Sequence, residues 1–270
     1  MAKLYIVGTP IGNMGDLTRR AEETLRSADV IACEDTRHSR PLLAEIGAKG
    51  RTIAYHKFNE AECARKIADL VREGKNVALI TDAGMPSVSD PGAEVVALCR
   101  REGIAVESVP GPSAATTAVA LSGVRAGGFV FLGFLPDKAA ELERTVLRAA
   151  KACLPLVVYV PPHDVKRTAA KLGELLGDRK VYAVREMTKL HECVEESTLL
   201  SFCCEERGEI VLVIEGEEER DPLLSLTPEE HLASYLGSGM DKKEAVKRVA
   251  QERGVPKNEI YRLTLGKEGD

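Results

Sequence analysis

The sequence predicts an α/β protein with two α/β domains and a small helical extension at its C-terminal end. Three short apolar runs, at 4–7, 77–81 and 105–109, each lead into a loop rich in glycine and proline and then into a stretch with a helical pattern. This alternation is typical of a parallel or mostly parallel sheet. The alternation resumes after a segment at 122–128 that contains three glycines, and the chain from Thr227 onward has only helical patterns.

Composition limits the classes of function. The 270 residues suit one large or two modest domains, and 44% apolar with 29% charged residues is ordinary for a soluble enzyme. A net charge of −5 excludes a general polyanion binder, so nucleic-acid contact would need a local basic patch. No apolar run could span a bilayer, and we expect no signal segment at the N-terminus. Seven cysteines without CxxC spacing favour reduced thiols in a cytoplasmic protein.

The first domain is expected over residues 1–122. After the first strand we expect a helix at 17–27, with Asp16 as its N-cap, and then a strand at 30–33. A helix should begin at 39–41, where Pro41 suits a first turn, and end near Gly47. Asn59 is a further candidate cap, for a helix that ends at Gly74. The remaining expected elements are strands at 52–55, 77–81 and 105–109 and helices at 92–101 and 113–121.

The second domain is expected over residues 123–222, and the glycine-rich segment 122–128 is the best candidate for a linker. Its expected strands are 129–134, 156–159, 181–185 and 209–214, and its expected helices are 139–151 and 165–176. An acidic turn at 215–221 separates it from the helical extension, residues 223–270.

The three loops that follow the apolar runs are the best candidates for a ligand site. They span 8–13, 82–92 and 110–115. In open α/β sheets, ligands bind beyond the carboxyl ends of the strands, and glycine lets the backbone approach them closely. The first loop lacks GxGxxG spacing and, taken alone, fits a tight strand–helix turn equally well. The second is more specific, because it combines two glycines, two prolines and two aspartates.

Polar groups at other strand ends are further candidates. Glu34, Asp35 and Arg37 follow the strand at 30–33, where they either contact a ligand or cap a helix N-terminus. His56 follows another strand, and we favour a substrate contact over a catalytic base there. The mixed charges at 185–189 also end a strand and are equally consistent with an exposed turn. The histidines lack metal-ligand spacing, so no metal is expected, and there is no GxSxG motif.

The helical extension is locally basic within an acidic protein. A sharp turn at 254–256 separates two helical patterns, which suggests a helix-turn-helix. One interpretation is contact with nucleic acid, and the other is an ordinary helical hairpin with solvated charges. The candidate contact residues are Lys242, Lys243, Lys247 and Arg248.

Taken together, these segments resemble the tetrapyrrole methylase superfamily, whose members bind S-adenosylmethionine between two α/β domains. The matching segments are 5–13, 34–38, 82–86, 90–92, 110–114, 133–136 and 185–189. The chain is most similar to members that methylate the ribose 2′-oxygen of a cytidine in 16S rRNA of the small ribosomal subunit. The specific parts are Thr-Pro-Ile-Gly-Asn at 9–13 and Glu-Asp-Thr-Arg at 34–37.

The resemblance implies a set of roles for individual residues. Glu34 or Asp35 would accept a hydrogen bond or proton from the ribose hydroxyl, and Arg37 would bind a phosphate. The family also implies a homodimer. The implied cofactor contacts are Pro10, Asp82, Ala83, Gly84, Val88, Ser113, Ala114, Ala115 and Glu186.

One segment departs from the family pattern. Where a Tyr-Glu-x-x-His-Arg sequence is expected, residues 159–164 lack the glutamate and the arginine. The resemblance therefore supports no role in substrate binding for this loop.

Three other functions are compatible with parts of the sequence. A methylase of a small tetrapyrrole is disfavoured by the basic extension and by residues 34–37. A non-enzymatic ribosome-binding protein is disfavoured by the intact first and second loops. A nicotinamide oxidoreductase is disfavoured because the chain has no GxGxxG.

Overall fold

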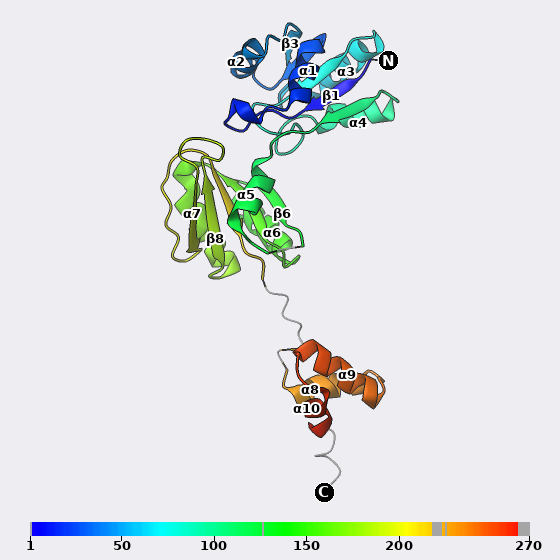
Figure 1. The fold of residues 1–270 in the computed structure, drawn as a ribbon, viewed down its shortest axis with the longest axis vertical. Coiled ribbons are helices and arrows are strands. Elements are labelled where there is room, and N and C mark those ends of the chain that lie inside the picture. The colour runs from blue at the N-terminus through cyan, green and yellow to red at the C-terminus, as the bar shows by residue number, and fades with distance from the viewer. Residues whose placement is uncertain (1, 126, 218–222, 225, 264–270) are drawn as a thin grey trace. The chain divides into compact units, whose positions relative to one another are not determined.

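The computed structural model describes residues 2–125, 127–217, 223–224 and 226–263 (Figure 1). The chain divides into two compact units, residues 1–216 and 217–270. The first unit holds two separate β-sheets, so the predicted architecture of two α/β parts is confirmed. The predicted boundaries at 122 and 222 stay predictions. Residue 126 of the predicted linker and residues 218–221 of the predicted acidic turn lie outside the described residues.

The first sheet is entirely parallel, as the sequence predicts. Its strand order is β3-β2-β4-β1-β5. Every residue of the two strands β2 and β4 is buried, which explains their unbroken apolar sequences. The strands are β1 (Leu4–Val7), β2 (Val30–Cys33), β3 (Arg51–Ala54), β4 (Val77–Ile80) and β5 (Val106–Val109).

Helices cover both faces of this sheet. On one face, Ile67 and Val95 from α3 and α4 pack against alternate residues of the strands. On the other face, Leu25 and Leu43 from α1 and α2 pack against the residues in between. Because the strands are all parallel, their carboxyl ends lie along the same edge of the sheet. The helices are α1 (Arg19–Ser27), α2 (Thr36–Glu45), α3 (Glu60–Arg72) and α4 (Ala93–Arg101).

Helix α1 begins later than predicted, and its N-cap is Thr18 rather than Asp16. The Thr18 hydroxyl accepts a hydrogen bond from the Ala21 N–H at 3.1 Å. Asp16 instead lies in a short 3₁₀ turn, η1 (Met14–Asp16), which Asn13 caps by accepting from the Gly15 N–H. Two nearby cap-forming residues compete here, and the second one forms the cap.

Helix α2 begins earlier than predicted, at Thr36, and contains Pro41 in its interior. Its N-cap is Asp35, whose carboxylate accepts from the Arg37 N–H at 2.8 Å. Proline lacks an N–H, so one helical hydrogen bond is missing at this point. The cap and the packing of Leu43 into the core outweigh that loss.

Helix α5 (Ala114–Ser122) follows the third loop but packs on the second sheet. Its Ala115 and Ala118 lie against Val157, Val184 and Val211 of that sheet. The sequence placed this helix in the first domain. The boundary predicted at 122 lies at the end of this helix and stays a prediction.

The second sheet is mostly antiparallel, unlike the parallel pattern expected to resume there. Its order is β6-β7-β10-β8-β9, in which β6 and β7 are parallel and the other neighbours antiparallel. Helices α6 (Ala139–Ala150) and α7 (Val165–Leu176) cover the face opposite α5. The strands are β6 (Val130–Phe134), β7 (Leu156–Val160), β8 (Lys180–Arg185), β9 (Cys193–Thr198) and β10 (Ile210–Ile214).

The described residues of the second unit form a bundle of the helices α8 (Pro228–Gly237), α9 (Lys242–Arg253) and α10 (Lys257–Leu263). Thr227 and Glu230 form a capping box at the start of α8. Leu232, Val249 and Ile260 meet in a small core. In the part of the chain that the structure describes, no helix is both long and apolar enough to cross a membrane.

Candidate active site

The three glycine-rich loops converge at the carboxyl edge of the first sheet. Thr9 and Gly84 form an isolated antiparallel bridge, in which each N–H donates to the carbonyl of the other at 2.9 and 3.1 Å. A Cβ atom added to Gly8 would lie 2.7 Å from the Gly111 backbone, so these two glycines allow two loops to touch. The convergence predicted from the sequence is therefore present.

A pocket of about 550 Å³ lies beside these loops, a volume that suits a ligand of cofactor size. One wall comes from the first sheet's loops and the other from β7, β10 and the segment before β10. The lining residues are Ile11, Glu34, Asp82, Ala83, Gly84, Met85, Val88, Ser89, Asp90, Ser113, Ala114, Phe134, Tyr159, Val160, Pro161, Pro162, Met187, Gly208, Glu209, Ile210 and Val211.

The pocket is acidic. Four carboxylates line it, from Glu34, Asp82, Asp90 and Glu209, and its lining includes no lysine, arginine or histidine. One carboxylate oxygen, Asp82 Oδ1, is buried and has no hydrogen-bond partner among the described residues. Because an unpaired buried acceptor costs free energy, this atom is suited to receive a donor from a ligand. The pocket therefore favours a ligand with hydroxyl or amine donors and net positive charge.

Glu34 and Asp90 are linked through the hydroxyl of Thr81. That hydroxyl donates to Glu34 Oε2 at 3.1 Å, and Asp90 also interacts with it. Burial, together with the negative charge of Glu34, raises the pKa of Asp90 to about 6. A carboxyl group with such a pKa can exchange a proton near neutral pH.

The opposite wall is aromatic and apolar. The ring of Tyr159 meets Phe131 and Phe134 edge to face, with centroids 4.9 and 5.6 Å apart. Burial raises the pKa of Tyr159, so its hydroxyl stays protonated. Residues 159–162 line the pocket, although no role was predicted for them from the sequence. The role of this segment was not predicted because the expected glutamate and arginine are absent. Its contacts with the pocket are made by aromatic and apolar side chains instead.

The neighbouring acidic residues Glu34 and Asp35 have different positions. Glu34 lines the pocket, whereas Asp35 caps α2 and forms a two-point ion pair with Arg37. The Arg37 side chain is 85% exposed. Hydrogen bonds from Arg37 hold the pKa of Asp35 well below its usual range. Asp35 therefore has the capping role that the sequence left open, and neither it nor Arg37 lines the pocket.

Seven of the predicted residues line the pocket, and several others do not. The seven are Glu34, Asp82, Ala83, Gly84, Val88, Ser113 and Ala114. Ala115, on α5, is buried against the second sheet, and Pro10 precedes the lining residue Ile11 without lining the pocket itself.

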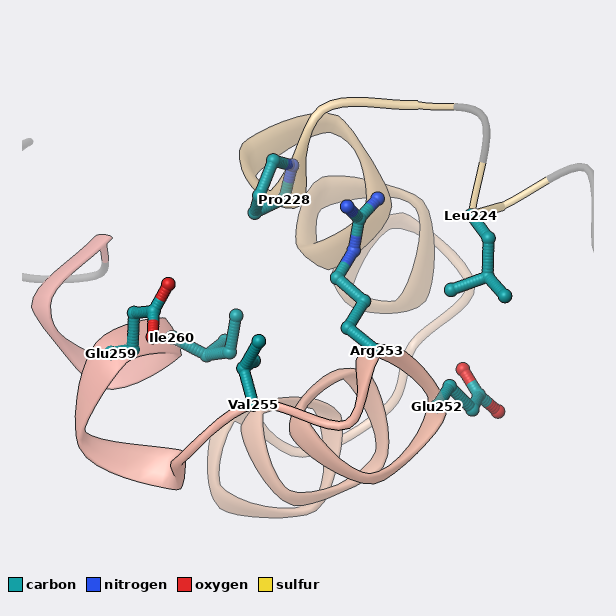
Figure 2. Close-up of a pocket in the computed structure, with 7 residues that line it drawn as sticks. All are labelled: Leu224, Pro228, Glu252, Arg253, Val255, Glu259 and Ile260. Carbon is teal, nitrogen blue, oxygen red and sulfur yellow. The ribbon is translucent and has the colours of Figure 1, made fainter.

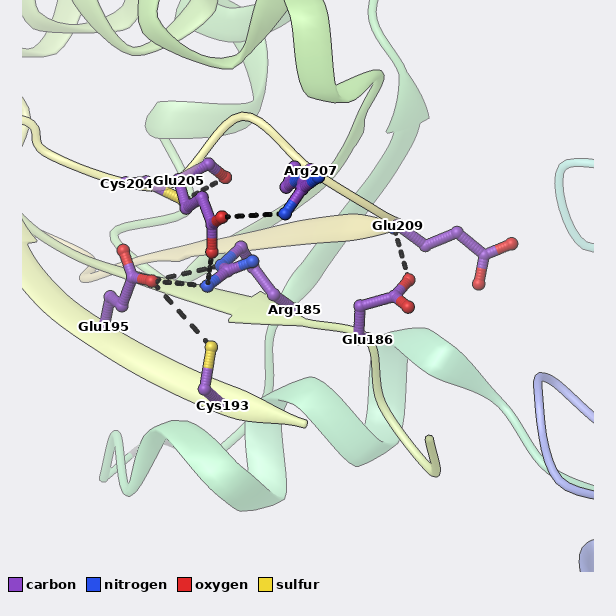
Figure 3. Close-up of polar contacts among 8 residues, drawn as sticks. All are labelled: Arg185, Glu186, Cys193, Glu195, Cys204, Glu205, Arg207 and Glu209. Atoms are coloured by element: carbon purple, nitrogen blue, oxygen red, sulfur yellow. Dashed lines mark hydrogen bonds and ion pairs between the residues drawn. The ribbon is translucent and has the colours of Figure 1, made fainter. Parts of the chain in front are cut away.

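Glu186 supports the pocket wall from behind. Its Oε1 accepts from the Glu209 N–H at 2.9 Å and from Lys189 Nζ at 3.0 Å. These contacts lower the pKa of Glu186. Figure 3 shows Glu186 beside Glu209, with the hydrogen bond drawn between them. Glu186 does not line the pocket, and its hydrogen bond holds the backbone at Glu209, which does. Its predicted contact with the cofactor stays a prediction.

The buried side chain of Arg185 is the centre of an ion-pair cluster whose carboxylates are partly exposed (Figure 3). It donates to Glu195 on β9 at 2.9–3.0 Å and to Glu205 at 3.1 Å. The charges at 185–189 are therefore not an ordinary exposed turn. They tie the edge strand β9 and the segment before β10 to strand β8.

His56 does not line the pocket, and its Nδ1 is buried without a partner among the described residues. Its ring lies 6.1 Å from that of Phe58, edge to face. The turn after β3 therefore carries two rings, His56 and Phe58, and only the histidine was predicted to contact a substrate.

The second unit presents the predicted basic residues on α9. Lys242, Lys243 and Lys247 are exposed, while Arg248 donates to Glu252 at 3.1 Å and lies over the Tyr235 ring at 5.2 Å. Glu252 and Arg253 line a small pocket of about 310 Å³ (Figure 2). The Arg253 guanidinium donates to the carbonyls of Leu223 and Leu226, before α8. Arg248 therefore contributes to the packing of the bundle.

Comparison with known proteins identifies the family. A model of the Tetrapyrrole (Corrin/Porphyrin) Methylases matches residues 3–202, and the chain belongs to this family. It is an S-adenosylmethionine-dependent methyltransferase.

Several relatives carry the name ribosomal RNA small subunit methyltransferase I. That of Halalkalibacterium halodurans is 39% identical over 270 residues, which cover 96% of this chain and 93% of that protein. That of Thermotoga maritima is 42% identical over 223 residues, covering 81% of this chain and all of that protein. The fold also matches Thermus thermophilus uroporphyrin-III C-methyltransferase complexed with S-adenosylhomocysteine, with a TM-score of 0.55, 22% identity, and 79% and 97% of the two chains covered.

The pocket fits this cofactor by its own chemistry. S-adenosylmethionine carries a sulfonium, an ammonium and one carboxylate, so its net charge is positive, and it has ribose and adenine donors. The acidic lining suits the charge, and the unpaired Asp82 Oδ1 suits a hydroxyl or amine donor. Ile11, Val88 and Val211 supply apolar surface for the remainder.

Proposed function

We propose that the protein methylates the ribose 2′-oxygen of a cytidine in the 16S rRNA of the small ribosomal subunit. The observation that carries the proposal is the 39% identity, over nearly the whole chain, to a protein named ribosomal RNA small subunit methyltransferase I. The cytidine and the 2′-oxygen rest on the resemblance at residues 9–13 and 34–37.

The cofactor would be held by the glycine-rich loops. Asp82 would accept a hydrogen bond from it, and the backbone of Ala83 and Gly84 and the N-terminal end of α5 at Ser113 and Ala114 would border it. When bound, S-adenosylmethionine supplies an electrophilic methyl group. The protein then has to exclude water and to place the ribose oxygen in line with that group, and such positioning accounts for about 7–11 kcal/mol of barrier reduction in well-oriented reactions.

Glu34 and Asp90 are the candidate proton acceptors for the ribose hydroxyl. Both line the pocket, and the Thr81 hydroxyl, which donates to Glu34, also interacts with Asp90. A hydroxyl is a weak nucleophile while it keeps its proton, so an acceptor within hydrogen-bond reach should speed transfer. A Glu34→Gln variant removes one of the four pocket carboxylates, so it should bind S-adenosylmethionine more weakly. At saturating cofactor it should still lose about 10²–10⁴-fold in turnover, measured in a methyl-transfer assay. Unchanged turnover would remove Glu34 from the reaction.

The RNA would be held outside this acidic pocket. His56 and the exposed lysines 242, 243 and 247, with a smaller contribution from Arg248, are the proposed contacts. The Thermotoga maritima relative leaves about a fifth of this chain without a counterpart, and the helical unit 217–270 has that size. We therefore assign this unit an auxiliary role in RNA binding and place the essential RNA contacts in residues 1–216.

We further propose a cytoplasmic homodimer. The odd number of cysteines without CxxC spacing supports the compartment, and the resemblance supports the dimer. Light scattering at micromolar concentration should give about twice the chain mass of 29.2 kDa. A mass of one chain would contradict the dimer.

The deciding experiment uses purified protein, S-adenosylmethionine with a labelled methyl group, and small subunits or naked 16S rRNA from cells that lack the protein. Nuclease digestion and mass spectrometry should give a single 2′-O-methylated cytidine. Labelling of a base, or transfer to a tetrapyrrole and not to RNA, would contradict the proposal.

A further inference from the structure

The turn between β3 and α3 exposes a large apolar ring. Phe58 is 94% exposed, the highest value among the large hydrophobic side chains of the described residues. Isolated exposed apolar side chains are common on proteins, so the environment of this ring has to decide its significance.

The ring stands on a fixed turn. Asn59 Oδ1 accepts from the His56 N–H at 2.8 Å, Asn59 Nδ2 donates to the Ala54 carbonyl at 3.1 Å, and the Asn59 N–H donates to the His56 carbonyl at 2.9 Å. Phe58 is therefore held out by a hydrogen-bonded loop that also orients the His56 ring beside it. Because the backbone of this turn is already ordered, it loses little conformational entropy when a partner binds.

The turn lies at the same sheet edge as the pocket. Strands β3 and β2 run parallel with Ala54 opposite Cys33, and the Tyr55 N–H donates to the Cys33 carbonyl at 2.8 Å. Glu34, which lines the pocket, follows Cys33 directly. Glu60 Oε1 also accepts from Tyr55 and from the Gly92 N–H, which ties the turn to the loop of Asp90.

The surroundings are basic although the protein is acidic. Arg37 and Arg40 on α2 and Lys57 in the turn are exposed. Asp35 pairs with Arg37, and Glu60 and Glu62 follow the turn on α3, so the local positive charge comes mainly from Arg40 and Lys57. Polyanions are attracted to such a surface. A second copy of the chain on a two-fold axis would place this positive surface against itself, so the charges favour RNA as the occupant.

We propose that Phe58 is a stacking platform for an unpaired base of the substrate RNA next to the nucleotide that enters the pocket. Lys57 and Arg37 would contact the adjoining phosphates. Unpaired bases are recognised by stacking on aromatic side chains, with phosphate contacts alongside. This inference rests on the proposed function and adds a specific contact to it.

The test uses the full-length protein and a single-stranded RNA of about ten nucleotides that carries 2-aminopurine, whose emission falls when it stacks. Phe58→Ala should weaken binding about 5- to 150-fold, with an unchanged salt slope and loss of the emission change. Phe58→Trp should restore the affinity and the emission change.

Lys57→Ala should instead reduce the salt slope of binding by about one unit. Leu200→Ala, which removes another largely exposed apolar side chain, is the matched control and should bind as the wild type does.

Each other outcome contradicts a specific statement. Wild-type affinity and quenching in Phe58→Ala, while the wild type methylates 16S rRNA, would overturn the stacking platform and leave the proposed function standing. A change from dimer to monomer in Phe58→Ala, with RNA affinity unchanged, would assign the ring to an interface between copies of the chain. A wild-type protein that neither binds nor methylates RNA would overturn the proposed function itself.

Discussion

Two aspartates of one loop are prepared for different tasks. Asp82 keeps a buried oxygen without a partner, which suits it to hold a ligand. Asp90 interacts with Thr81 and faces the charge of Glu34, which suits it to exchange a proton. Eight positions separate them in the sequence, and both line the same pocket. A ligand site and a proton acceptor can thus be placed together by a single loop.

The raised pKa of Asp90 predicts a dependence of stability on pH. The folded protein binds this proton up to about pH 6, whereas the unfolded chain releases it near 3.8. Between these values the folded state binds more protons, so the free energy of unfolding should fall as pH rises from about 4 to about 6. Urea unfolding of wild type and Asp90→Asn across this range should show that contribution as a difference in slope. Parallel curves for the two proteins would contradict it.

The backbone conformation at position 84 requires glycine. Its φ is +84°, and an added Cβ would meet only ordinary contacts, so strain and not a clash limits substitution. Gly84→Val should cost about 1–3 kcal/mol of stability and abolish detectable binding of S-adenosylmethionine in calorimetry. The matched control is Gly74→Val, which has a similar φ of +88° at a helix end away from the pocket. The control should lose stability alone, and retained binding in Gly84→Val would remove Gly84 from the site.

At the level of single residues, the sequence indicated the neighbourhood of the site better than its members. Glu34 and Asp35 both follow a strand, and nothing local to the sequence separates the one that faces the pocket from the one that caps a helix. No role was predicted for Tyr159 and its neighbours, because in a sequence the apolar residues of a pocket wall have the same pattern as core residues. Their role depends on which strands meet, which is a tertiary property.

At the level of elements, the strong periodic segments were predicted closely and the polar ones were not. Strand β2 and helix α7 have the predicted bounds, because β2 is buried throughout and α7 buries residues at regular helical spacing. Strand β9 was missed because it is a polar edge strand, held by the Arg185 ion pairs and by pairing with β8. The antiparallel pairing in the second sheet was not predicted either, because the amino-acid composition of a strand does not show in which direction it runs relative to its neighbours.

Helix α9 carries a prediction of its own. Replacing Lys242, Lys243 and Lys247 by alanine should weaken RNA binding and reduce its salt slope by up to about three units, because each lysine that neutralises a phosphate adds about one unit to the slope. Affinity for S-adenosylmethionine should not change. The control variant replaces the exposed lysines 49, 75 and 151, which changes the net charge equally. If the two variants bind RNA alike, the charges of α9 are ordinary solvated charges.

For the whole molecule, the separate packing of the two units predicts separable roles. The helical unit has its own core of Leu232, Val249 and Ile260, and the pocket is lined entirely by residues below 216. A chain ending at Gly216 should therefore bind S-adenosylmethionine as the full chain does, while its affinity for RNA is reduced. Calorimetry and RNA titration on both chains would measure this. Loss of cofactor binding in a folded, shortened chain would contradict it.

The connection between β5 and α5 has a mechanical consequence for the pocket. Strand β5 of the first sheet ends at Val109, and helix α5, which packs on the second sheet, begins at Ala114, so only four residues join these two elements. Two of the four are prolines with restricted φ, and Gly111 is wedged against Gly8. We expect such a joint to resist rotation, so that the spacing of the walls is set during folding and does not change when the ligand binds. A cofactor then meets a site already at its working width, and little of its binding free energy is spent on ordering the protein.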